Sequence, residues 1–167
     1  MLKTLSTSLL LLLALAVAAQ PPTLPVTYIT HADITGFIKA LPDNEVNDKP
    51  IRSVDAGGYH VAVYGVKRPK GLAQDANLHQ TRTSEIYYML EGSGTLVTGG
   101  SMPGAKPMAP GSTNLQSKTI KGGESRRVAA GDVVIIPGHT PHQWSSQDGM
   151  LKYLIFRPDP DSKIPLK

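Results

Sequence analysis

The sequence contains no cysteine in its 167 residues. Disulfide bonds, thiol catalysis and a lipid-modified cysteine anchor are therefore excluded. Large aromatic residues are also scarce, with two Phe and one Trp. The basic residues are scattered in short groups such as Arg126-Arg127 and are not interleaved with aromatic residues. Because a nucleic-acid interface needs a basic patch and often stacking aromatics, we expect no nucleic-acid partner.

The longest apolar run is too short for a membrane-spanning helix, which needs roughly 20 residues. It reads LLLLLALAVAA from Leu9 to Ala19, follows the basic Lys3 and ends in small residues before Gln20. This arrangement is typical of a cleaved secretory signal peptide. We therefore expect residues 1–19 to be removed, no membrane anchor, and a secreted or periplasmic protein.

One helix is expected in an N-terminal arm that spans residues 20–50. Thr30 can cap the helix, Asp33 lies in its first turn, and Pro42 stops it. Its apolar positions follow i, i+3, i+4, i+7 spacing and are Ile34, Phe37, Ile38 and Leu41. We expect this stripe to pack on the following domain, with partner binding as the alternative.

From Ile51 onward the sequence changes to short β-rich runs divided by Gly and Pro. The predicted strands span residues 51–55, 59–67, 77–83, 85–90, 95–98, 125–128, 132–136, 142–145 and 151–157. Short strands without a second helix predict an all-β barrel or sandwich, as a single domain over residues 51–167. The Gly- and Pro-rich segment 99–118 has no periodicity, and we predict a long surface loop there, either a lid or a mobile segment.

His79 and Glu85 lie in the first of two segments that resemble the motifs of the cupin superfamily. The family pattern is G-x5-H-x-H-x3,4-E-x6-G. His79 takes the place of its first histidine and Glu85 that of its glutamate, and six residues separate Glu85 from Gly92. Thr81 stands where the family has its second histidine, and a hydroxyl is a poor ligand for a transition metal compared with imidazole.

The second segment, GDVVIIPGHTPHQW, resembles the pattern G-x5-P-x-G-x2-H-x3-N. Gly131, Pro137 and His142 fall in register, whereas His139 replaces the inner glycine and Ser146 the final asparagine. The resemblance implies a small jelly-roll-type cupin β-barrel preceded by one short α-helix. Since cupins commonly pair through edge strands, it also implies a homodimer.

His79, Glu85 and His142 together offer two imidazoles and one carboxylate. Such a set can bind one divalent transition metal and leave positions open for a small-molecule ligand; iron, manganese, zinc and nickel all suit it. Residues two apart on a strand share a face, so His79 and Thr81 point the same way and Glu85 can rejoin that face. The alternative is a degenerate cupin in which Glu85 and His142 hydrogen-bond each other.

Further pocket candidates share strand parity with this set. Tyr87 and Met89 match Glu85, and Trp144 matches His142, so these side chains can line the cavity, with ordinary core packing as the alternative. Thr81 is a candidate on the same basis.

Two other histidines have competing interpretations. His60 shares a strand face with Ala62 and Tyr64, and if that face points inward it can serve as a base near the site; otherwise it is a packed or surface histidine. His139 lies in a loop three residues before His142, where it is either exposed at the barrel mouth or a ligand.

Two functions remain open on the sequence. The first is a metal-dependent enzyme, an oxygenase, lyase or isomerase, acting on a small oxygen-rich molecule chelated at the metal. The second is a non-catalytic module that binds a small ligand or a metal outside the cytoplasm. Fold alone does not decide between them.

Overall fold

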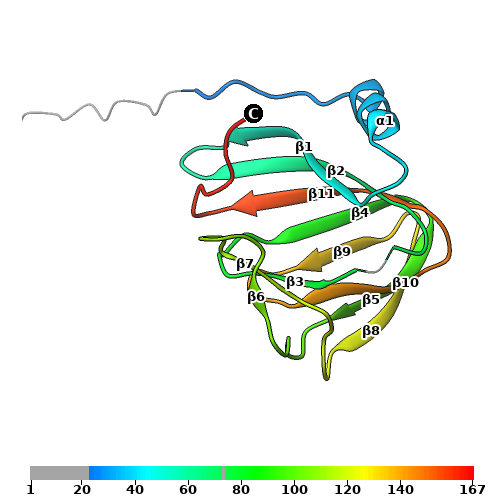
Figure 1. Ribbon diagram of the computed structural model, residues 1–167. Coiled ribbons are helices and arrows are strands. Elements are labelled where there is room, and N and C mark those ends of the chain that lie inside the picture. The colour runs from blue at the N-terminus through cyan, green and yellow to red at the C-terminus, as the bar shows by residue number, and fades with distance from the viewer. Residues whose placement is uncertain (1–22, 73) are drawn as a thin grey trace, which may run out of the picture.

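The computed structural model describes residues 23–72 and 74–167, so the predicted signal peptide at residues 1–19 lies outside the described residues. Within them, one helix precedes eleven strands (Figure 1). The elements are α1 (His31–Ala40), β1 (Asn47–Asp55), β2 (His60–Arg68), β3 (Ala76–His79), β4 (Glu85–Glu91), β5 (Ser93–Thr98), β6 (Lys106–Pro107), β7 (Asn114–Ser117), β8 (Glu124–Ala129), β9 (Val133–Ile136), β10 (His142–Gln147) and β11 (Leu151–Asp159).

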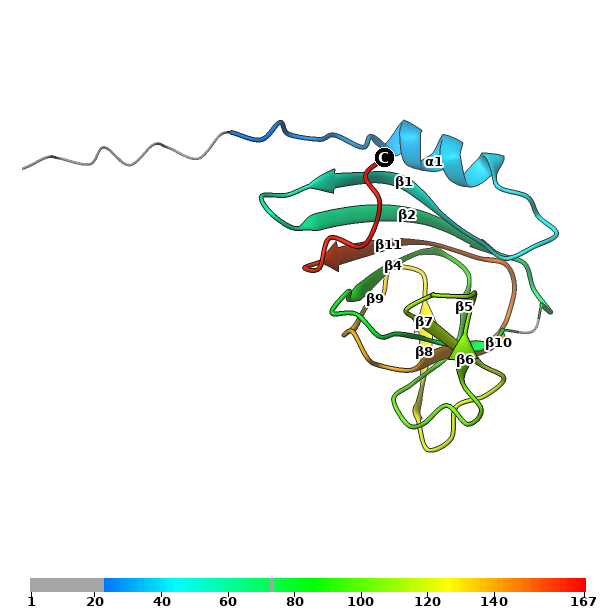
Figure 2. The same cartoon turned by 60° about the vertical axis from the view of Figure 1, so that its left-hand side comes forward.

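The strands form two antiparallel sheets. The first has the order β1-β2-β11-β4-β9, and the second has the order β6-β7-β3-β10-β5-β8. The two views in Figures 1 and 2 show the sheets facing each other, with the chain crossing between them several times. The prediction of an all-β barrel preceded by one short helix is confirmed.

Strand alternation places the core between the sheets. In β4, Tyr87 and Met89 are buried while Tyr88 is exposed on the outer face. The β4–β11 register places Met89 opposite Tyr153, so these side chains share the inner face. Each fully buried large apolar side chain contributes about 1.5–3 kcal/mol. The buried cluster comprises Val66, Tyr87, Met89, Leu96, Val128, Ile136, Trp144, Leu151, Tyr153 and Ile155.

Helix α1 lies outside the first sheet, against β2 (Figure 2). Thr30 and Asp33 form a reciprocal capping box at its start: Thr30 Oγ1 accepts from the Asp33 amide at 3.1 Å, and Asp33 Oδ2 accepts from the Thr30 amide at 2.9 Å. Gly65 of β2 admits the helix, because a Cβ at that position would lie 2.8 Å from Phe37. In the part of the chain described, no helix combines the length and apolarity needed to cross a membrane.

Three strand predictions needed correction. Strand β1 begins at Asn47 and not at Ile51, and β3 ends at His79, where the chain bends before Thr83. The predicted loop 99–118 contains the strands β6 and β7, and β7 pairs with β3 along its whole length. Strand β7 reads NLQS, so its half-buried positions are largely polar and show no apolar alternation.

Candidate metal centre

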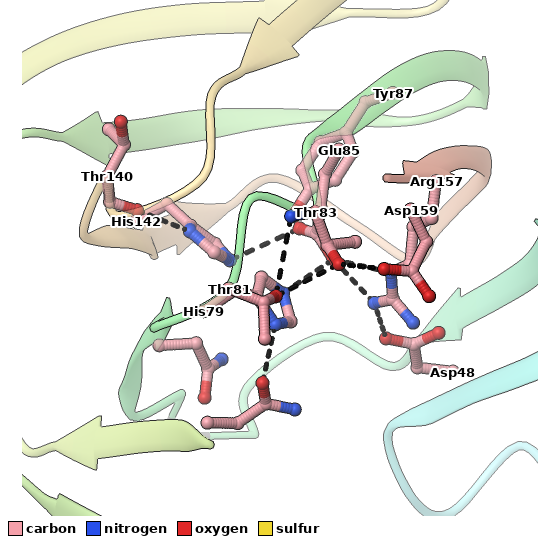
Figure 3. Close-up of polar contacts among 12 residues, drawn as sticks. Asp48, His79, Thr81, Thr83, Glu85, Tyr87, Thr140, His142, Arg157 and Asp159 are labelled. Carbon is pink, nitrogen blue, oxygen red and sulfur yellow. Dashed lines mark hydrogen bonds and ion pairs between the residues drawn. The ribbon is translucent and has the colours of Figure 1, made fainter. Parts of the chain in front are cut away.

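Three strand ends bring the predicted ligands together inside the barrel (Figure 3). His79 ends β3, Glu85 begins β4, and His142 begins β10. One ligand atom from each of these residues lies within 4.8 Å of the other two. Glu85 and His142 are 1% and 6% exposed, and His79 is half-buried. The residues that the two motifs single out therefore form one cluster.

The two imidazoles approach opposite oxygens of one carboxylate. His79 Nε2 lies 3.0 Å from Glu85 Oε1, and His142 Nε2 lies 3.3 Å from Glu85 Oε2. The imidazole rings stack with centroids 5.8 Å apart and planes inclined by 28°. Both Nε2 atoms thus face Glu85 from the same side of the site.

The other nitrogen of each ring is held by an acceptor. His142 Nδ1 lies 3.1 Å from the Thr140 carbonyl oxygen, and His79 Nδ1 lies 2.8 Å from Asn114 Oδ1. A carbonyl oxygen can only accept, so Nδ1 of His142 carries the hydrogen. With the Asn114 amide assigned in this orientation, the same holds for His79. Each ring therefore directs its Nε2 atom toward Glu85, and Nε2 is the nitrogen left to bind a metal when Nδ1 carries a hydrogen.

This donor arrangement fits a cation. An imidazole nitrogen that presents a lone pair to a carboxylate repels it, unless a proton or a metal ion lies between the nitrogen and the carboxylate oxygen. His79 Nε2 lies within hydrogen-bond distance of Glu85, whereas the 3.3 Å separation at His142 exceeds the roughly 2.7–2.9 Å of a charge-assisted N–H···O bond, so the His142 contact is the looser of the two. Two imidazoles and one carboxylate form a donor set that suits a divalent transition metal, and His79, Glu85 and His142 are the residues that could hold one.

Arg157 of β11 completes the site, and sequence reasoning missed it. Its Nε donates to Glu85 Oε1 at 2.7 Å, and its Nη2 donates to Asp48 Oδ2 at 2.7 Å. The guanidinium also lies 4.0 Å from the centre of the Tyr64 ring. Strand alternation in the sequence could have indicated its position, because Arg157 lies two residues after the buried Ile155 and so points to the same face of β11.

Arg157 keeps Glu85 ionised. Burial raises the pKa of the Glu85 carboxyl, but the Arg157 charge and the two imidazoles lower it by more, and the pKa falls well below its ordinary value. For His79, burial lowers the pKa, while the hydrogen bond and charge of Glu85 raise it above its ordinary value overall. The carboxylate is therefore ready to bind a cation without first losing a proton.

Tyr87 supports Glu85 through a hydrogen bond. Its hydroxyl donates to Glu85 Oε2 at 2.8 Å, and its ring meets that of His142 edge-on at 6.5 Å. Burial and the negative charge of Glu85 raise the pKa of Tyr87 well above its ordinary value, so it stays a neutral donor. Tyr87 orients the carboxylate, which is a more specific role than lining a cavity.

Asn114 was also missed, because it lies in the segment predicted as a loop. The β3–β7 register places Asn114 directly opposite His79, which explains why its amide reaches the ring. No local pattern marks a pairing between residues so far apart in sequence.

The remaining pocket candidates lie around the cluster. Thr81 Oγ1 donates to Thr83 Oγ1 at 2.9 Å, and Thr83 Oγ1 donates to the buried Asp159 at 3.0 Å. Thr81 and His79 line a cavity of about 180 Å³. Met89 and Trp144 belong to the hydrophobic core, and Trp144 also lines a separate cavity of about 610 Å³ that none of the three candidate ligands borders.

His60 and His139 stand apart from the three ligands. The strand face of His60 is the inward one, but His60 Nδ1 lies 2.7 Å from the Ile164 carbonyl oxygen, which ties it to the C-terminal segment. His139 is exposed and its backbone amide donates to the His79 carbonyl at 2.9 Å.

Comparison with known proteins identifies the architecture. No protein-family model matches the sequence, and no curated protein sequence does. Among solved structures, the protein BH2720 of Bacillus halodurans is 15% identical, with a TM-score of 0.53 over 85% of this chain and 86% of that chain. The two antiparallel sheets and helix α1 match the cupin jelly-roll fold. The motif resemblance predicted this fold, and the prediction is confirmed.

Two further structures named for this fold give lower TM-scores. A conserved protein with a double-stranded β-helix domain from Klebsiella pneumoniae is 15% identical, with a TM-score of 0.49 over 84% of this chain and 97% of that chain. An RmlC-like cupin family protein from Methanocaldococcus jannaschii is 14% identical, with a TM-score of 0.41 over 72% of this chain and 88% of that chain.

The cupin motif explains one strained residue. His139 occupies the inner glycine position of the second motif and has a φ of 62°. A side chain in this left-handed region costs roughly 1–2 kcal/mol, which glycine avoids. The preceding Gly138 is required by packing, because a Cβ there would lie 2.5 Å from the Thr81 carbonyl oxygen.

Proposed function

We propose that this cupin binds one divalent transition metal, namely iron, manganese, zinc or nickel, and is an enzyme for a small oxygen-rich molecule chelated at that metal. The observation that carries the proposal is the convergence of His79, Glu85 and His142 with both Nδ1 atoms already bound to acceptors. Structural contacts of this kind preset the ring orientation that metal binding needs.

The protein supplies the ligand geometry and the electrostatics. A bound divalent metal would provide Lewis-acid chemistry toward a substrate oxygen, and iron or manganese would add redox chemistry. His79 and His142 contribute neutral nitrogen donors, while Arg157 and Tyr87 hold the Glu85 carboxylate in place. Three protein ligands leave positions for two substrate oxygens, which favours an oxygenase, lyase or isomerase.

A non-catalytic binding module is the second candidate. Each carboxylate oxygen of Glu85 already has protein partners: His79 and Arg157 at Oε1, and His142 and Tyr87 at Oε2. A cluster satisfied in this way is consistent with a metal-free barrel that binds a ligand without chemistry. The other two histidines that the sequence offered as candidates near the site, His60 and His139, stand apart from this cluster in the described chain.

Two experiments separate these candidates. Elemental analysis of protein recovered from its native compartment tests the metal directly. The metal-loaded protein is then incubated with excess hydroxy acids, dicarbonyls and phenols, while oxygen uptake and product formation are followed. Product exceeding one equivalent per site, and lost in His79→Ala, supports the enzyme. Saturable binding without product supports the binding module and rejects the enzyme.

Export and pairing complete the proposal. Residues 1–19 have the composition of a signal peptide, so secreted material should begin at Gln20, and a mass that includes Met1 would reject export.

A homodimer is supported by the exposed apolar side chains of edge strand β9, where Val133 and Ile135 are 59% and 68% exposed. Light scattering coupled to size exclusion measures the oligomeric state.

A further inference from the structure

A cavity of about 130 Å³ adjoins the three candidate ligands and contains polar groups that metal binding does not use. Besides the ligands and Arg157, it is lined by Arg68, Asp48 and Asn77, which come from β2, β1 and β3. These three residues lie on both sheets, so the cavity is polar on more than one side.

Arg68 offers hydrogen-bond donors to this cavity. Its Nε donates to Tyr153 Oη at 2.6 Å, and Tyr153 Oη also accepts from Trp144 Nε1 at 3.2 Å. These contacts fix the guanidinium from one side. The terminal nitrogens Nη1 and Nη2 of Arg68 have no hydrogen-bond acceptor in residues 23–72 and 74–167. A guanidinium held by Nε alone presents its planar fork to an oxyanion.

Asp48 and Asn77 offer acceptors to the same cavity. Asp48 Oδ2 accepts from Arg157, but Asp48 Oδ1 is buried and has no partner. Asn77 Oδ1 is likewise buried without a partner in the described chain. Buried acceptors are normally satisfied, so two of them beside one cavity indicate a ligand that brings a hydrogen-bond donor.

The charges around the cavity favour an anion. The guanidinium groups of Arg68 and Arg157 balance the carboxylates of Asp48 and Glu85. A divalent ion bound between two neutral imidazoles would leave its own charge uncompensated in a poorly solvated space. An anionic ligand supplies the missing negative charge, because charges in such surroundings need a partner.

We propose that the cavity selects a small carboxylate that also carries a hydroxyl or amino group, such as a short hydroxy acid. Its carboxylate pairs with the Arg68 fork, and the molecule lies beside the His79–Glu85–His142 cluster. An amino group donates one hydrogen to Asp48 Oδ1 and another to Asn77 Oδ1, whereas a hydroxyl shares its single hydrogen between these two acceptors. This inference rests on the proposed function for the metal, and it names the substrate class. A cavity of about 130 Å³ accommodates roughly five or six non-hydrogen atoms, since one of ~150 Å³ holds benzene.

Lactate, lactamide and propionate test the two recognition elements separately. Lactamide lacks the carboxylate charge and propionate lacks the hydroxyl. Calorimetric titration of the metal-loaded protein should give tighter binding of lactate than of lactamide, by roughly 10- to 100-fold, and than of propionate, by roughly fivefold. Equal affinities for all three compounds would overturn the proposal.

Two variants assign these preferences to residues. Arg68→Gln should remove most of the preference for lactate over lactamide, and Asn77→Leu should reduce the preference for lactate over propionate. Arg126→Gln is the matched control, because Arg126 is 77% exposed and pairs with Glu124. If Arg68→Gln folds but binds lactate like the wild type, the proposal is wrong. If Arg68→Gln does not fold, Arg68→Lys keeps the charge without the fork and should still lower lactate affinity.

The same titration on metal-free protein separates this inference from the proposed function. Weaker binding of lactate that still depends on Arg68 would establish the anion site even where no metal is retained. A protein that binds metal, but binds lactate no better than lactamide, would keep the metal centre and reject the substrate class.

Discussion

Arg157 and Glu85 form a buried ion pair in which Arg157 Nε lies 2.7 Å from Glu85 Oε1. Their side chains are only 12% and 2% exposed. The pair comes from β11 and β4, which lie side by side in the first sheet. It fixes the protonation state and the position of the carboxylate on which both histidines converge, so Arg157 is integral to the candidate metal centre.

Replacing Arg157 with Met should destabilise the protein by about 3–5 kcal/mol, because Glu85 and Asp48 would both lose the buried guanidinium that balances their charge. Chemical denaturation monitored by tryptophan fluorescence measures the change. Arg82→Met is the matched control, since the Arg82–Asp161 pair is largely exposed on the arginine side and should contribute about 0–1 kcal/mol. Similar losses from both variants would contradict the role of Arg157.

Removing the acceptor behind His79 should weaken metal binding without removing a ligand. In Asn114→Ala, His79 Nδ1 loses its partner and the ring loses its fixed tautomer, so metal affinity should fall by about 10- to 100-fold. Competition with a chromophoric chelator gives the dissociation constant. The exposed Asn44→Ala should leave it unchanged. An unchanged constant in Asn114→Ala would show that the contact does not orient His79.

The hydroxyl of Tyr87 should stabilise the folded protein. Tyr87→Phe keeps the buried ring but deprives Glu85 Oε2 of a donor, at an expected cost of about 1–3 kcal/mol. Tyr88→Phe, on the exposed face of the same strand, should change stability by less than about 0.5 kcal/mol. The midpoints of thermal and chemical unfolding distinguish the two variants, and equal midpoints would argue against the Tyr87–Glu85 bond.

Restoring glycine at the cupin motif position should stabilise the chain. His139→Gly relieves a positive φ at an exposed residue, and the net gain should be about 0.5–1 kcal/mol after the added freedom of the unfolded chain is included. Thr140→Gly should destabilise, because Thr140 has no positive φ. A loss of stability in His139→Gly would mean that the imidazole makes a contact that outweighs the strain.

The sequence predicted which three residues gather at the candidate site, but not two of the residues that support them. Motif spacing and strand parity are local patterns that can be read from one sequence, and they single out His79, Glu85 and His142. Arg157 and Asn114 enter the site through pairing between distant strands, β11 with β4 and β7 with β3. Such register is set by the whole sheet, and the polar strand β7 carries no apolar alternation to reveal it.

Metal content is the most direct test of the central claim that His79, Glu85 and His142 bind one ion. Elemental analysis should find close to one divalent transition metal per chain in the wild type and in Thr81→Ala and His31→Ala, whose side chains are not among the three ligands. His142→Ala should lose the metal, and the added stability that metal gives the wild type in unfolding experiments should disappear with it. A wild type that binds no metal under any loading condition, or equal metal loss in Thr81→Ala and His142→Ala, would contradict the account.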